Sequence, residues 1–184
     1  MKLRKGFALI LGIMSACVFN TSFAQDELTG DTRLACEAIL CLSSGTRPSE
    51  CNPSLNHYYG INKKKFKDTI KARKNFLNLC PVSDQTSEMR TLVNAISEGA
   101  GQCSAAELNF RLNRGDEKRR IDNRMPNYCR AYFGHDYTDF VEYQPRYVGT
   151  PDEEGYWVEP QDYESELAKY NRWLQEQKKR RWQD

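Results

Sequence analysis

Six cysteines are the residues of this chain most able to do chemistry, because paired thiols can close disulfide bonds. The sequence of 184 residues holds seven cysteines, of which Cys17 lies in an apolar stretch near the start. The other six are Cys36, Cys41, Cys51, Cys80, Cys103 and Cys129. They form no Cys-x-x-Cys pair, no haem-attachment motif and no zinc-type spacing with histidine. We therefore expect three structural disulfides, with no metal and no cofactor, and the sequence does not choose among the possible pairings.

Three further residues are the best candidates for acid–base catalysis. Glu37 is flanked by apolar residues on both sides, which makes it the best candidate for the carboxylic acid that a wall-cleaving glycosidase needs in its cleft. The two histidines, His57 and His135, lie in no recognised nucleophile motif. Because no catalytic signature accompanies any of the three, structural roles are the favoured interpretation. We expect no catalytic residue and no enzyme activity.

A strongly basic segment from residue 63 to residue 74 could instead bind a partner. Its cations are Lys63, Lys64, Lys65, Lys67, Lys71, Arg73 and Lys74. On a helix, such a face could make salt-sensitive contact with anionic lipid, cell-wall polymer or passing DNA. The alternative is a solvated helix face whose long side chains cover the edge of the core.

The first 24 residues have the features of a secretory signal. A basic start is followed by the apolar run from Phe7 to Ile13, and small residues at Ser22 and Ala24 favour cleavage after Ala24. The competing interpretation is a lipoprotein signal, with lipid attached to Cys17. No later apolar run approaches the ~20 residues of a transmembrane helix, so we expect no membrane span after cleavage. The predicted location is the periplasm.

The charge of the mature chain gives no reason to expect binding to a specific nucleic acid. The full sequence has a net charge of +2, from 27 basic and 25 acidic residues. The signal contains three of the basic residues and none of the acidic ones, so the remainder is nearly neutral. The basic character of the whole sequence therefore comes mostly from the export signal.

Hydrophobic periodicity predicts a mainly α fold. The expected helices cover residues 33–44, 49–59, 63–79 and 86–97, with a further one from residue 104. Gly45 is the expected stop of the first helix and Ser49 the cap of the second. Ser104 begins a capping box with Glu107. Cys36 and Cys41 project about 140° apart on a helix, so we do not expect them to pair with each other.

The second half of the sequence changes character. Residues 136–160 are acidic and aromatic without a period, which predicts an extended strap over the surface with at most a short β-pair. Residues 161–184 form a charged terminal helix. We thus expect a signal peptide over 1–24, a disulfide-linked helical domain over 25–135, and these two segments after it.

Four blocks contain all six of these cysteines: CEAILCLSSGTRPSEC, IKARKNFLNLCP, CSAAELNFRLN and MPNYCRAYFGHDYTD, the last followed by YVG. From about Leu34 to Gly149 the chain resembles the TrbM/KikA/MpfK family of conjugal transfer proteins. The resemblance implies a periplasmic component or accessory of a conjugative type IV secretion system, needed for plasmid transfer and acting by binding or assembly. Its implied partners are other envelope proteins of that mating-pair-formation system, and it implies no catalytic residue. The alternative is a wall-acting hydrolase that serves the same apparatus.

Overall fold

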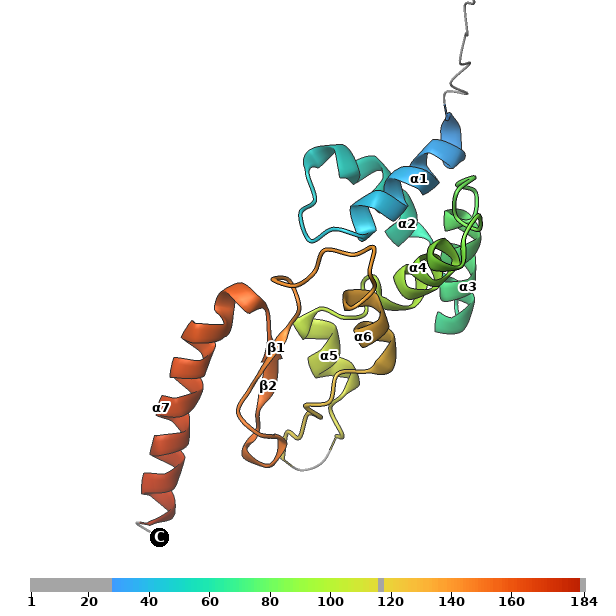
Figure 1. Cartoon of the computed structure of the whole chain (residues 1–184). Coiled ribbons are helices and arrows are strands. Elements are labelled where there is room, and N and C mark those ends of the chain that lie inside the picture. Colours follow the sequence, from blue (N-terminus) through green and yellow to red (C-terminus); the bar gives the residue numbers. More distant parts are fainter. Residues whose placement is uncertain (1–27, 116–117, 183–184) are drawn as a thin grey trace, which may run out of the picture.

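The computed structural model describes residues 28–115 and 118–182, and this part of the chain is mainly helical (Figure 1). The predicted signal, its cleavage site and Cys17 lie outside the described residues. The helices are α1 (Gly30–Leu42), α2 (Asn52–Gly60), α3 (Phe66–Leu77), α4 (Ser87–Gly99), α5 (Ala105–Arg111), α6 (Asn127–Phe133) and α7 (Tyr163–Arg181). Strands β1 (Arg146–Val148) and β2 (Tyr156–Val158) form an antiparallel pair, with Tyr147 opposite Trp157. Within the two described ranges, no helix is both long and apolar enough to cross a membrane.

Helices α1 to α4 form the larger core because each turns one apolar stripe inward. In α1 the buried residues Ala35, Ala38, Ile39 and Leu42 follow helical spacing. They pack in one cluster with Tyr58 of α2, with the end of α3, and with the apolar face of α4. The hydroxyl of Tyr58 donates to the Ile96 carbonyl at 3.1 Å, which satisfies a polar group at the centre of this cluster.

Three disulfides link these elements, as the cysteine count predicts. Cys36–Cys80 joins α1 to the turn after α3, and Cys41–Cys51 joins α1 to the short 3₁₀ turn (Ser49–Cys51) before α2. Cys103–Cys129 joins the turn before α5 to α6. The two cysteines of α1 therefore reach different partners, as their angular separation on the helix requires.

The C-terminal half forms two smaller clusters. In the first, α5 and α6 pack around Cys103–Cys129 and Trp157. In the second, α7 covers the strand pair through Val148, Val158 and Tyr170. Figure 1 shows α7 along the outer side of this hairpin. Beyond Leu174, nearly every described side chain of α7 is exposed.

Several details differ from the sequence-based expectations. Helix α6 was not predicted, because its seven residues are too few for a clear period and it is stabilised by packing against α4. The segment 136–160 contains the expected β-pair, yet Phe140, Val148, Trp157 and Val158 are buried, so it is more than a surface strap. Phe140 and Trp157 fill core positions, whereas Tyr137 and Tyr143 are exposed.

Of the two N-caps predicted from the sequence, Ser104 is correct and Ser49 is wrong. The side chains of Thr86 and Ser104 accept the N–H groups of Met89 and Glu107, as expected of N-caps. Ser49 makes no capping bond, because the chain enters the turn before α2 at Pro48. The first helix ends at Leu42, before Gly45, and the third begins only at Phe66.

Candidate functional site

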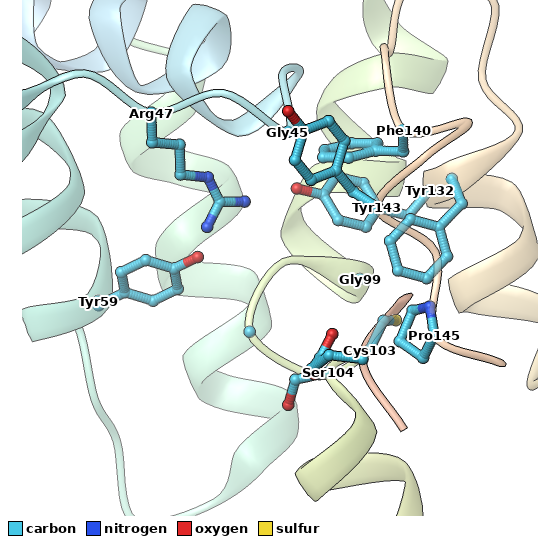
Figure 2. A pocket seen from close by; sticks show the side chains of 13 residues that line it. Gly45, Arg47, Tyr59, Gly99, Cys103, Ser104, Tyr132, Phe140, Tyr143 and Pro145 are labelled. Atoms are coloured by element: carbon cyan, nitrogen blue, oxygen red, sulfur yellow. The ribbon is translucent and has the colours of Figure 1, made fainter. Parts of the chain in front are cut away.

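A cavity of about 230 Å³ lies between the loop after α1, the C-terminal ends of α2 and α4, and α6 with the chain that follows it (Figure 2). Residues far apart in the sequence line it together. They are Gly45, Arg47, Tyr59, Gly99, Gly101, Cys103, Ser104, Tyr132, Phe133, Phe140, Tyr143, Pro145 and Glu159. Three of the four sequence blocks that carry the family resemblance contribute to this lining. The cavity is therefore the part of the fold where those blocks converge.

Glycines allow aromatic rings to form the cavity walls. A Cβ atom at Gly45 would overlap the ring of Tyr143, and one at Gly99 would overlap Tyr132. In both places the ring lies directly against the main chain, at a separation that any side chain on the glycine would prevent. Gly45 is therefore required by this contact. The prediction that it stops the first helix is wrong, because α1 ends at Leu42.

Hydrogen bonds hold the loop after α1 against the segment after α6. The Gly45 amide donates to the Asp139 carbonyl at 3.1 Å, and the Asp139 amide donates to the Ser43 carbonyl at 2.8 Å. The Tyr132 hydroxyl donates to the Leu42 carbonyl at 2.6 Å. Thr46 Oγ1 and the Tyr143 hydroxyl are 3.1 Å apart. The wall of the cavity is consequently fixed at several points.

Arg47 is the cation of this cavity. Figure 2 shows its guanidinium directed into the hollow, across from the hydroxyl of Tyr59. Among the described residues, no carboxylate lies within 4.0 Å of it. Burial raises the pKa of Tyr132, and the charge of Arg47 opposes that increase because it favours the phenolate form. The guanidinium therefore acts on the cavity without a neutralising partner.

Glu159 is the acidic residue of the lining, but its carboxylate is already in use. Its Oε1 accepts a hydrogen bond from the Ala105 amide at 2.7 Å. Ser104 likewise accepts from the Glu107 amide, at 3.3 Å, and neither histidine of the chain lies in the lining. The cavity thus combines a free cation, phenol hydroxyls and aromatic rings. This arrangement can bind an anionic group attached to an apolar stem.

The three candidate acid–base residues lie apart from the cavity and from one another. Glu37 accepts a hydrogen bond from Arg33 at 2.6 Å, in an ion pair along the surface of α1. The ring of His57 stacks on Phe76, with centroids 4.4 Å apart. Each is accounted for by a structural contact with its neighbour.

His135 lies in the turn after α6 and has a partner for each ring nitrogen. Its Nδ1 accepts from the Tyr137 amide at 3.1 Å. Its Nε2 is 3.0 Å from Thr91 Oγ1 and carries the proton when Nδ1 is the acceptor. These contacts fix the turn against α4. Within residues 28–115 and 118–182, no group of histidine, cysteine and acidic residues could hold a metal ion.

The basic segment from residue 63 to residue 74 contains lysines that lie at the surface and one arginine that lies in the core. Its lysines are exposed, apart from the half-buried Lys74, and we name them the lysine face: Lys63, Lys64, Lys65, Lys67, Lys71 and Lys74. Arg73 does not belong to this face, because it is only 8% exposed. Its guanidinium lies 4.9 Å from the centroid of the Tyr58 ring, and its Nε donates to the Ile61 carbonyl at 3.3 Å. Arg73 is therefore a structural residue, contrary to the prediction.

The residues that make the cavity were missed by the sequence analysis. Arg47 stands in a turn between two cysteines, and Tyr59, Tyr132 and Tyr143 come from three other segments. One available signal was the Gly45-Thr46-Arg47-Pro48 turn inside the most distinctive block, where a lone cation follows a glycine. Nothing in the sequence places this turn beside Tyr143, almost a hundred positions later.

Comparison with known protein families gives a match over most of the chain. The model of the TrbM family matches residues 27–171, which include all the residues that line the cavity and all three disulfides. No curated protein and no solved structure gives a significant match to the chain.

Proposed function

Because the chain belongs to the TrbM family of conjugal transfer proteins, we propose that it is a periplasmic component or accessory of the conjugative type IV secretion system. In this proposal it acts by binding other envelope proteins of the apparatus or by helping them to assemble. Plasmid transfer between cells requires it.

The three disulfides support the periplasmic location. Disulfides form and persist in oxidising compartments, and the bacterial periplasm is one of them. The six cysteines pair completely, two by two, in the described part of the chain. The export signal predicted over residues 1–24 agrees with this location. Osmotic-shock fractionation of donor cells measures it directly.

The cavity is the observation that carries the binding role. Its free cation, Arg47, and its aromatic walls are complementary to an anionic group on another molecule. The side chains of Glu159 and Ser104, which also line the cavity, already accept hydrogen bonds from main-chain amides. A wall-acting hydrolase would need a carboxylic acid poised in a cleft. The best sequence candidate, Glu37, is paired with Arg33 on the surface of α1. Binding accounts for the arrangement better than catalysis does.

A conjugation assay tests both parts of the proposal. Deletion of the gene in a donor strain should lower the frequency of plasmid transfer, and the wild-type gene supplied in trans should restore it. A variant with Glu37→Gln, His57→Ala and His135→Ala should also restore transfer if it accumulates normally. A hydrolase that used any of these groups would lose several orders of magnitude in rate.

Immunoblotting of the periplasmic fraction is the control for accumulation of the triple variant. A stable, exported triple variant that fails to restore transfer would contradict the binding role and favour the hydrolase. Unchanged transfer after deletion would contradict the role of the chain in conjugation.

A further inference from the structure

We propose that the cavity binds a carboxylate of a partner protein, and that Arg47 pairs with it. This inference rests on the proposed function, because it specifies the chemistry by which the chain would bind a component of the apparatus. The carboxylate comes from an aspartate or glutamate side chain or from the C-terminus of the partner.

Charge is the first argument. The side chain of Arg47 is exposed, so water solvates its guanidinium, and an anion that enters the hollow would form an ion pair that no other acid contests. In the described part of the chain no acid lies within ion-pair distance of Arg47. The carboxylate of Glu159 is engaged by the Ala105 amide. The anion must therefore come from another molecule.

The number of cations selects a carboxylate over a phosphate. Arg47 is the one basic residue among those that line the cavity. A single guanidinium matches the single charge of a carboxylate and can hold both of its oxygens through parallel N–H donors. A phosphate group carries up to two charges and is usually held by more than one cation. The hydroxyl of Tyr59 faces the guanidinium and can supply a further donor (Figure 2).

The size of the cavity favours a carboxylate carried by a protein over a free small molecule. A volume of about 230 Å³ is below the roughly 300–1,000 Å³ of typical small-molecule pockets. It suits one inserted side chain or one chain end. The rings of Tyr59 and Tyr143 also line the cavity, and the methylene groups of an acidic side chain can pack against them.

The site is also rigid before any partner binds. Pro48 restricts the backbone of Arg47, which immediately precedes it, to extended conformations. The loop before it is hydrogen-bonded to Asp139, and Cys103–Cys129 closes the opposite wall. A preorganised cation loses less conformational entropy on binding.

The test uses the mature, disulfide-intact protein labelled with ¹⁵N and titrated with short peptides. The probes are acetyl-Gly-Glu-Gly-amide, which has only a side-chain carboxylate, and acetyl-Gly-Gly-Gln, which has only a terminal one. Acetyl-Gly-Gln-Gly-amide has neither and is the neutral control. At least one carboxylate probe should shift the amide signals of Gly45, Gly99 and Gly101, with an affinity at least tenfold above that of the control peptide. The probe that binds identifies the source of the carboxylate.

Two variants separate the role of Arg47 from general charge. Arg47→Gln should weaken binding at least tenfold, whereas Arg124→Gln, which removes another exposed arginine outside the cavity, should leave it unchanged. Both side chains are exposed, so both variants should keep the circular dichroism spectrum of the wild type. Equal binding of charged and neutral peptides would overturn the inference, and so would tighter binding of inorganic phosphate than of either carboxylate probe.

The conjugation assay distinguishes a failure of this inference from a failure of the proposed function. Arg47→Gln should lower transfer while accumulating normally, and Arg124→Gln should not. If deletion abolishes transfer but no carboxylate probe binds, the inference is wrong and the role in conjugation stands. If the carboxylate probes bind and deletion leaves transfer unchanged, the proposed function is wrong and the carboxylate site stands.

Discussion

Removing the disulfides one at a time should reveal how much each loop closure contributes to stability. The comparison is between the double variant Cys36→Ala/Cys80→Ala and the double variant Cys41→Ala/Cys51→Ala. In each bond one cysteine is buried and the other half-buried, so the packing lost with the sulfur atoms is similar. The two bonds differ mainly in the length of chain that they close.

The magnitudes follow from the entropy of the unfolded chain. Cys36–Cys80 spans 44 positions, for which loop closure predicts about 4 kcal/mol of stabilisation. Cys41–Cys51 spans 10 positions and predicts about 2.7 kcal/mol. The shorter loop lies inside the longer one and shortens it, but the logarithmic dependence makes this correction only a few tenths of a kcal/mol.

Urea unfolding of the mature protein, followed by far-ultraviolet circular dichroism, measures both free energies. Mass spectrometry without reduction should first show that the wild type has no free thiol after Ala24. We expect the Cys36–Cys80 variant to be the less stable of the two by about 1 kcal/mol. The loop-entropy reasoning would be refuted if loss of Cys41–Cys51 cost as much as or more than loss of Cys36–Cys80.

Three further predictions concern a surface, a close contact and the tyrosines. One variant reverses three charges of the lysine face: Lys64→Glu, Lys67→Glu and Lys71→Glu. Its Tm should stay within a few degrees of the wild type, because exposed charges contribute only about 0.2–1 kcal/mol to stability. Its salt-sensitive cosedimentation with envelope fractions should fall. Loss of folding with intact association would contradict this prediction. Gly99→Ala should lower the free energy of unfolding by about 1–3 kcal/mol, because the new methyl group would overlap Tyr132. The control Gly60→Ala, with open space around the glycine, should not lower it. Equal urea midpoints for the two variants would refute the close contact between Gly99 and Tyr132. Burial raises the pKa of Tyr147 and Tyr156 to about 12, above the ordinary value of 10.0 for tyrosine. The stability they contribute is therefore fully present below pH 10.0 and is lost as the pH rises through about 12; unfolding that begins well below pH 10 in an alkaline titration would contradict this.

The sequence alone predicted the features that depend on residue types and on spacing along the chain. The cap at Ser104 depends on a side chain and an amide three positions later, so the pattern is visible in the sequence. The even cysteine count indicates three disulfides, and helical geometry excludes the pair Cys36–Cys41. The family resemblance likewise depends on cysteines and their immediate neighbours. Each of these inferences depends on residue types and on spacing along the chain, without knowledge of how the helices pack.

Helix α3 is an intermediate case. A run of basic residues indicates an exposed face, and this holds for its lysines. Arg73, however, lies one helical turn after the buried Thr69 and one before Leu77, so it points into the protein. There it meets Tyr58, which belongs to another helix. Composition indicated the charge of this segment, while the packing of α3 against α2 decided which cation is structural.

The cavity was decided by the tertiary structure alone. The hollow is lined jointly by Arg47, Tyr59, Tyr132 and Tyr143. The packing of α6 on α4 and the hydrogen bonds between Ser43, Gly45 and Asp139 bring these residues together. The disulfide pairing was decided in the same way. Contacts between positions tens of residues apart depend on how whole helices pack, and no local periodicity or spacing specifies that packing.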